Sequence, residues 1–156
     1  MSTYRLLLAG AIVLAILALG LRFARLNDAP PVVADPVRTP GVLNPDVTQQ
    51  TIGETICVPG WTKTIRPPTD YTNALKLRQM RTYGLTGAAS AFQEDHLISL
   101  ELGGHPTDPR NLWPEPYPRA ARVDLIENEL NAKVCSRAMS LADAQGRESA
   151  IKHEDG

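Results

Sequence analysis

Residues 94–116 read EDHLISLELGGHPTDPRNLWPEP, and this stretch decides the fold that we expect. It places an acid and a histidine, Asp95 and His96, at the start of an alternation of apolar and polar side chains. Alternation with a period of two is typical of a strand that is buried on one face. The pattern therefore predicts a β-strand over residues 92–102.

The segment that follows predicts a loop and then a long helix. Gly103 and Gly104 permit a tight loop, and the prolines of residues 103–118 allow at most a short strand at residues 111–113. Apolar residues at helical spacing predict a helix from Arg119 to Ala138. Its predicted core face consists of Val123, Ile126, Leu130 and Val134.

Weaker signals place the remaining elements of the domain. Residues 56–58 predict a short strand before a Pro-Gly turn, and residues 65–68 an extended segment. A helix capped by Asp70 or Thr72 is expected to end at Gly84. Ser140 and Asp143 predict the start of a last short helix, followed by a polar, frayed tail over residues 146–156.

The N-terminal part differs in composition from the rest. Residues 6–21 are apolar and uncharged, with Arg5 before them and Arg22 after them. As a helix this run spans roughly 24 Å, against roughly 30 Å for the membrane core, so residues 1–25 are interpreted as an uncleaved anchor or a cleaved signal. Residues 26–51 are rich in proline and predict a semi-extended linker, which leaves residues 52–145 as the domain.

Composition leaves the partner of the domain open. The chain has 156 residues, 43% of them hydrophobic, and a net charge of -1, which neither requires nor excludes a polyanion. Residues 61–83 are locally basic, and a strip of this kind is typical either of a surface that contacts a phosphate backbone or of a solvated helix. The candidate nucleic-acid contacts are Lys63, Arg66, Arg78 and Arg81.

The chain has two cysteines, Cys57 and Cys135, near the two ends of the predicted domain. No CxxC motif or nearby histidine gives them the spacing of a metal site. In an exported domain such a pair favours a disulfide and an oxidising compartment. The alternative is two unpaired buried thiols.

The pair Asp95 and His96 has the chemistry of phosphodiester hydrolysis. This reaction needs a base that deprotonates water and a cation that takes up charge on the phosphate. Histidine titrates near neutrality and suits the base, whereas a carboxylate suits a hard cation such as Mg²⁺. Neighbouring strand residues point to opposite faces, so the two side chains are expected to have different roles.

At these residues the sequence resembles the HNH endonuclease superfamily, with its ββα-metal module. It also resembles small exported bacterial proteins that carry ICVPGWT, RPP, DHLIPLELGG and RNLWPEP in this order. Here the motifs read ICVPGWTKTIRPP, DHLISLELGG and RNLWPEP, and the resemblance covers about residues 55–145. It implies that His96 is the general base, that Asp95 is a metal ligand and that Asn111 pins the loop and helps to hold His96. Glu94 would support the site from behind.

The sequence departs from these relatives at two positions. Ser99 stands where they carry proline, and Arg119 stands where they carry an asparagine at the start of the helix. Arginine does not bind cations, so Asp124 or Asn131 on the polar face of the helix is the candidate replacement ligand. His105, Trp61 and Trp113 are interpreted as loop or core residues.

The resulting expectation is an α+β fold with a small ββα-metal, HNH-like core, additional helices and one disulfide, preceded by a membrane helix and a proline-rich linker. Its expected activity is hydrolysis of DNA with a divalent metal ion such as Mg²⁺, bound by Asp95 and Asp124, and no small-molecule cofactor. The domain would lie in the cell envelope, tethered to the membrane, or be secreted if the N-terminal segment is cleaved. The alternative is an inactive HNH-like fold that serves as a binding or structural module.

Overall fold

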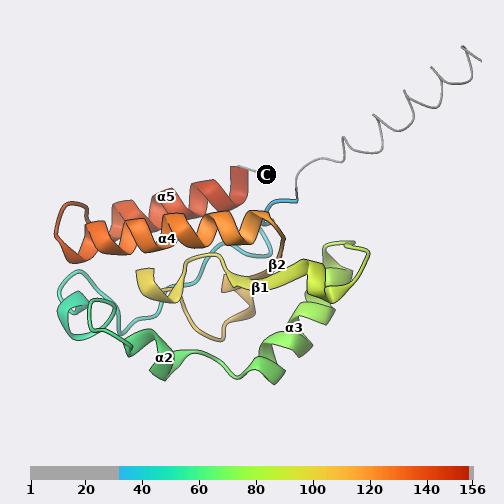
Figure 1. The fold of residues 1–156 in the computed structure, drawn as a ribbon, viewed down its shortest axis with the longest axis horizontal. Coiled ribbons are helices and arrows are strands. Elements are labelled where there is room, and N and C mark those ends of the chain that lie inside the picture. The colour runs from blue at the N-terminus through green and yellow to red at the C-terminus, as the bar shows by residue number, and fades with distance from the viewer. Residues whose placement is uncertain (1–31, 155–156) are drawn as a thin grey trace, which may run out of the picture. The chain divides into compact units, whose positions relative to one another are not determined.

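Two antiparallel strands, β1 (Phe92–His96) and β2 (Leu112–Pro116), lie at the centre of the fold (Figure 1). The computed structural model describes residues 32–154. In the register of the hairpin, Asp95 is opposite Trp113 and His96 is opposite Leu112. Two prolines are tolerated in β2 because both strands of a two-stranded sheet have an outer edge, where no N–H group is required.

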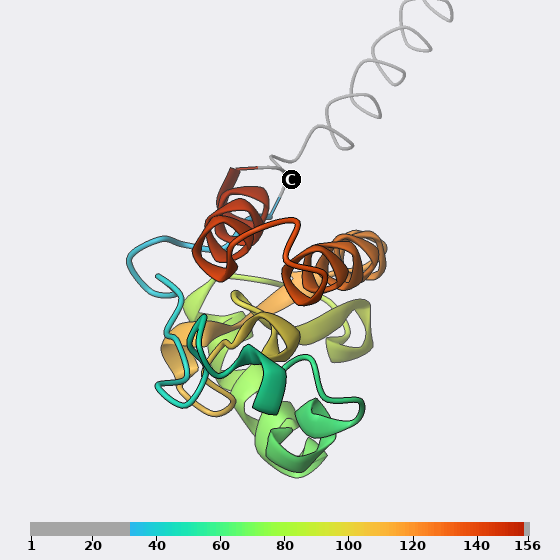
Figure 2. The same cartoon turned by 90° about the vertical axis from the view of Figure 1, so that its left-hand side faces the viewer.

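Helices cover both sides of the hairpin. α3 (Thr69–Thr82) packs against both strands on one side, and α4 (Arg119–Cys135) packs against them on the other. α5 (Leu141–Glu154) lies beside α4, so that Figure 2 shows the strands between two helical layers. The expected α+β class is therefore confirmed, with the strands forming a single hairpin within the described residues.

The first strand is shorter than the alternation predicts, because it ends at His96 instead of residue 102. Beyond it the chain turns into a 3-10 helix, η3 (Leu100–Leu102), and then into Gly103 with a positive φ of 79°. Leu97, Ile98, Leu100 and Leu102 are all buried. These four residues are apolar because the loop and 3-10 helix after β1 bury them, not because they lie on one face of a strand.

The other helices correct the predicted boundaries. α3 begins at Thr69 with Pro68 at its N-cap, so neither Asp70 nor Thr72 caps it, and α4 ends at Cys135 instead of Ala138. Residues 56–58 form turns, not a strand, and lead into a short helix, α2 (Trp61–Ile65). Three further 3-10 helices complete the list: η1 (Ile52–Glu54), η2 (Ala89–Ala91) and η4 (Pro109–Asn111).

Residues 32–51 belong to the domain and do not form a free linker. Ala34, Thr39 and Val47 are buried, and the backbone N–H of Ala34 donates to the carbonyl oxygen of Lys152 at 2.9 Å. The compact unit therefore begins at Val32, earlier than the predicted boundary at residue 52. The predicted membrane segment, residues 1–25, and the first linker residues lie outside the described part of the chain. No helix between residues 32 and 154 is both long and apolar enough to span a membrane.

The C-terminal tail is also part of the fold. The prediction of a frayed segment from residue 146 is wrong, because α5 continues to Glu154 and buries Glu148 and Lys152. This helix is polar over much of its length, which is why its sequence resembles a solvated tail.

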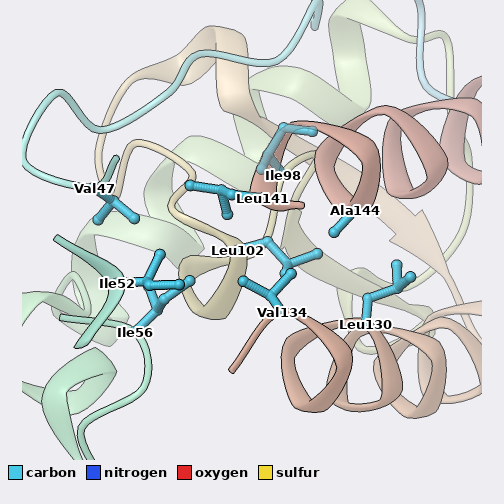
Figure 3. Close-up of a cluster of buried hydrophobic side chains, with 9 residues drawn as sticks. All are labelled: Val47, Ile52, Ile56, Ile98, Leu102, Leu130, Val134, Leu141 and Ala144. Atoms are coloured by element: carbon cyan, nitrogen blue, oxygen red, sulfur yellow. The ribbon is translucent and has the colours of Figure 1, made fainter. Parts of the chain in front are cut away.

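The main hydrophobic core lies between residues 47–56, η3 and the helices α4 and α5. It contains Val47, Ile52, Ile56, Ile98, Leu102, Leu130, Val134, Leu141 and Ala144 (Figure 3). The predicted core face of α4 is confirmed, with Ile126 at its partly buried margin. At one side of this core Cys57 and Cys135 form the predicted disulfide.

Candidate active site

A pocket of about 310 Å³ lies beside the end of β1. Its wall includes the predicted pair Asp95 and His96 together with Arg66 and with Asp124 of α4. Although neighbouring residues of a strand point to opposite faces, both members of the pair line the pocket, because β1 ends at His96 and the chain turns there.

His96 is held in one orientation. Its Nε2 lies 3.0 Å from the carbonyl oxygen of Pro106. A carbonyl can only accept, so Nε2 carries the proton and Nδ1 of the neutral ring is an acceptor. Burial lowers the pKa of His96 below its ordinary value of 6.5, so the neutral form dominates at pH 7. A neutral ring with a free acceptor nitrogen can take a proton from water.

Three carboxylates face one another across the pocket. Asp95, Asp124 and Glu127 each place one oxygen within 4.8 Å of the others. The two α4 residues are three apart and thus share a helix face. Gln93 bridges the aspartates, donating through Nε2 to Asp95 Oδ1 at 3.2 Å and to Asp124 Oδ1 at 3.3 Å. The sequence prediction of Asp95 and Asp124 as a ligand pair thus gains a third member, Glu127.

The carboxylates do not share one charge state. Burial would raise the pKa of Asp95, but the charge of Lys152 and the hydrogen bonds from Glu115 and Lys152 together outweigh it, and the pKa falls to about 2. Burial raises the pKa of Asp124, and it raises the pKa of Glu127 well above the ordinary value of 4.5. A divalent cation bound among these carboxyl groups would favour their ionised forms.

The ammonium of Lys152 reaches this cluster from α5. Its Nζ donates to Asp95 Oδ2 at 2.7 Å, to Glu127 Oε1 at 2.5 Å and to Glu148 Oε1 at 3.2 Å. A further contact joins it to the backbone oxygen of His96 at 2.5 Å. The side chain is completely buried. Burial alone would lower the pKa of Lys152, but the surrounding carboxylates raise it well above 10.5, so the ammonium is charged.

Asn111 occupies the role that the sequence resemblance implies for the loop. Its Oδ1 accepts from the N–H of Ile98 at 3.0 Å, and its Nδ2 donates to the carbonyl oxygens of Ile98 and His105, each at 3.0 Å. Gly104 lies beside this network, where an added Cβ would be 1.7 Å from the Ile98 oxygen. The amide thus joins the end of β1 to the start of β2 and fixes the loop that carries Pro106, the partner of His96.

Arg119 does not line the pocket. Its guanidinium is buried, where it pairs with Glu115 and donates to the carbonyl oxygen of Ile151 at 2.7 Å. It also lies over the ring of Trp113, 5.5 Å from the centroid. Burial raises the pKa of Glu115 to about 8. The arginine at the expected ligand position therefore ties β2 to α5 instead of facing a cation.

The predicted nucleic-acid contacts separate into two groups. Arg66 is exposed at the pocket and, among residues 32–154, is the single cation that lines it. Lys63 is exposed on α2, whereas Arg78 and Arg81 are exposed on α3. None of these three residues lines the pocket.

The remaining candidates have structural partners. Asn131 donates to the carbonyl oxygens of Ile56 and Glu101, at 3.4 and 2.7 Å, and is not a member of the acidic cluster. His105 Nδ1 accepts from two backbone N–H groups of its own loop. Trp113 is fully buried and Trp61 packs against the main core, as interpreted from the sequence.

Glu94, which the sequence suggests as a supporting residue of the site, makes no side-chain hydrogen bond within the described residues. Both of its carboxyl oxygens are buried and have no hydrogen-bond partner among the described residues. Burial raises the pKa of Glu94 to about 8, although the charge of Lys76 on α3 offsets part of this effect. The carboxyl is therefore neutral at pH 7 and does not add charge to the site.

Sequence reasoning missed Glu127, Glu148 and Lys152. A signal existed, because Glu127 follows Asp124 by three residues and Glu148 precedes Lys152 by four. Both spacings are equally typical of solvated helix faces, so neither points to a buried site. Comparison of the chain with protein-family models, with curated proteins and with solved structures gives no match.

Proposed function

We propose that the protein is an HNH-like endonuclease that hydrolyses DNA phosphodiester bonds with a divalent metal ion. The observation that carries the proposal is the orientation of His96. Its Nε2–H is used by Pro106, and its acceptor Nδ1 belongs to a ring that lines the same pocket as Asp95 and Asp124. The order of β1, loop, β2 and α4, with Asn111 closing the loop, supports a ββα core.

The residues present fit a hard divalent cation. Asp95, Asp124 and Glu127 offer oxygen ligands within 4.8 Å of one another, which is the donor type that Mg²⁺ and Mn²⁺ prefer. Ser99 adds a second observation, because it lines the pocket and its buried Oγ has no partner among the described residues. When bound, the cation would supply positive charge to a phosphate oxygen and to the leaving oxygen.

In this proposal each side chain of the pocket has a separate role in the reaction. His96 Nδ1 accepts the proton of a water molecule, whose oxygen attacks the phosphorus while the bond to the opposite ester oxygen breaks. Asp95, Asp124 and Glu127 would hold the cation, and the carbonyl oxygen of Pro106, by accepting from Nε2, would stabilise the imidazolium of His96. Arg66 at the pocket contacts a phosphate oxygen of the substrate.

Two observations favour a second function, an inactive HNH-like module that binds a partner in the envelope. The ammonium of Lys152 already neutralises part of the cluster, and Arg119 replaces the asparagine of related sequences. A domain with these features would keep the fold without hydrolysing DNA.

The test uses the full-length chain in detergent with supercoiled plasmid and Mg²⁺ or Mn²⁺. We expect nicking that EDTA abolishes and that His96→Ala lowers by at least about 100-fold, the contribution typical of a general base. Asn73→Ala, an exposed change on α3, is the matched control and should leave nicking unchanged. Absence of metal-dependent nicking in a folded protein would favour the inactive module.

We also propose that the domain resides in the cell envelope or is secreted. The disulfide between Cys57 and Cys135 supports an oxidising compartment. The arginine-flanked apolar run at residues 6–21 supports a membrane tether or an export signal. Fractionation of the host cell, with the mobility of the chain compared before and after reduction, tests both points.

A further inference from the structure

The ammonium of Lys152 stands in an oxygen cage of the kind that usually holds a metal ion. Its four neighbours are carboxylate oxygens of Asp95, Glu127 and Glu148 and the backbone oxygen of His96, at 2.5 to 3.2 Å. They come from β1 and from the consecutive helices α4 and α5. All four are hard oxygen ligands, the donor set of Mg²⁺, Mn²⁺ or Ca²⁺.

The cage shares two of its carboxylates, Asp95 and Glu127, with the candidate metal site. Lys152 contacts one oxygen of Asp95, Oδ2, and one oxygen of Glu127, Oε1. The other oxygen of Asp95, Oδ1, accepts from Gln93 Nε2, which also donates to Asp124 Oδ1. Each shared carboxylate therefore has an inner oxygen on the ammonium and an outer oxygen that the ammonium leaves unused.

We propose that Lys152 takes the place of a metal ion at the inner oxygens of this carboxylate cluster. Its ammonium positions Asp95 and Glu127 for a single divalent ion in the pocket. It also prevents a second divalent ion from binding at the inner oxygens. The part that concerns the pocket ion rests on the proposed function. Lys152 is a positioning residue in this scheme, because it touches the carboxylates and neither the water nor the phosphate.

The contact geometry argues against an ordinary ion pair. A surface pair joins one cation to one carboxylate, as Lys133 and Glu129 do on α4. Lys152 instead faces three carboxylates while being fully buried. Its removal leaves four converging oxygens, to which a small cation can bind. If Lys152 only stabilised the packing of α5, its removal would not create a site that binds a cation.

The proposal is tested by replacing the ammonium and then supplying cations. We would measure Mn²⁺ binding by electron paramagnetic resonance and thermal unfolding by circular dichroism, on full-length protein in detergent. The variants are wild type, Lys152→Ala, Lys152→Ala with Glu148→Gln, and Lys133→Ala as the exposed lysine control. Propylammonium is added as a second probe, because it restores the lost amine without a metal.

We expect one Mn²⁺ per wild-type chain and two per Lys152→Ala chain. The melting temperature of Lys152→Ala should fall and then recover with Mn²⁺ or propylammonium, which should have little effect on Lys133→Ala. The double variant removes one carboxylate of the inner cage, and should bind a single Mn²⁺ and melt higher than Lys152→Ala without added cation.

An unchanged Mn²⁺ number in Lys152→Ala, without recovery by either cation, would overturn the proposal. Failure of both variants to fold in the presence of Mn²⁺ would also count against it, since the inner oxygens would then accept no replacement. Failure of the proposed function gives a different result. Wild type would bind no Mn²⁺ and would not nick plasmid, whereas Lys152→Ala would still gain one ion.

Discussion

Replacement of Asn111 by alanine should be among the most damaging single changes in the domain. Asn111 is fully buried, and its amide makes three hydrogen bonds, each 3.0 Å long, to backbone groups of Ile98 and His105. Alanine would leave one N–H group and two carbonyl groups without this partner. A buried polar group that loses its partner costs about 1 to 3 kcal/mol, so for three such groups we expect a loss of roughly 3 to 9 kcal/mol in the free energy of unfolding.

Urea unfolding of the disulfide-bonded protein, followed by circular dichroism and by tryptophan fluorescence, measures this loss. With a slope of about 2 kcal/mol per molar urea, the midpoint should fall by roughly 1.5 to 4.5 M. Asn73→Ala provides the control, because Asn73 is exposed on α3, and its cost should stay within about 0.5 kcal/mol.

Asn111→Asp separates the accepting and donating parts of the side chain. Aspartate keeps an acceptor for the Ile98 N–H group, but its second oxygen would face the carbonyl oxygens of Ile98 and His105. It should be no more stable than the alanine variant. If Asn111→Ala lost less than about 1 kcal/mol, or if the aspartate variant matched wild type, the pinning role of this amide would be refuted.

Three further outcomes are expected. Gly104→Ala should prevent accumulation of folded protein, because the new Cβ would lie 1.7 Å from a backbone oxygen, whereas Gly53→Ala, with nothing within 4 Å, should melt close to wild type. Glu94 has its pKa raised to about 8, so between pH 4.5 and 8 the folded state keeps a proton that the unfolded state releases, and stability falls as pH rises. Glu94→Gln should therefore stabilise the domain at pH 8 more than at pH 5, by about 1.4 kcal/mol for each pH unit, and the exposed Glu54→Gln should show no such trend in pH-dependent melting. Reduction of the disulfide, which joins residues 78 positions apart, should lower the unfolding free energy by about 4 to 5 kcal/mol in urea titrations, and an equal midpoint before and after reduction would contradict this.

The features that the sequence predicts correctly are those with a local cause. Gly103 adopts a positive φ and Gly104 has no room for a side chain, as a tight loop after the first strand requires. The apolar face of α4 follows from helical periodicity alone. The resemblance implies Asp95 as a metal ligand and the polar helix face offers Asp124; both line one pocket, and their binding of a metal ion stays a prediction.

The features that the sequence does not predict depend on partners far along the chain. β1 ends early because the side chain of Asn111 takes the N–H and C=O groups of Ile98, which a longer strand would have used for pairing. Residues 32–51 have no apolar period, yet Thr39 and Val47 are buried against elements that follow them much later. Periodicity describes one element at a time and carries no information on such contacts.

The C-terminal helix α5 is the clearest example of a feature that depends on distant partners, because its charged residues pair with buried acids of β1 and α4. A buried ammonium costs several kcal/mol unless carboxylates surround it, and crowded carboxylates repel one another unless a cation lies between them. Lys152 and the acids of β1 and α4 therefore stabilise one another, and neither arrangement would persist without docking of α5. Folding of α5 and assembly of the acidic site are thus one cooperative event. Lys152, one of the charged residues that make residues 146–154 resemble a solvated tail, contacts Asp95 and Glu127, two side chains that line the pocket.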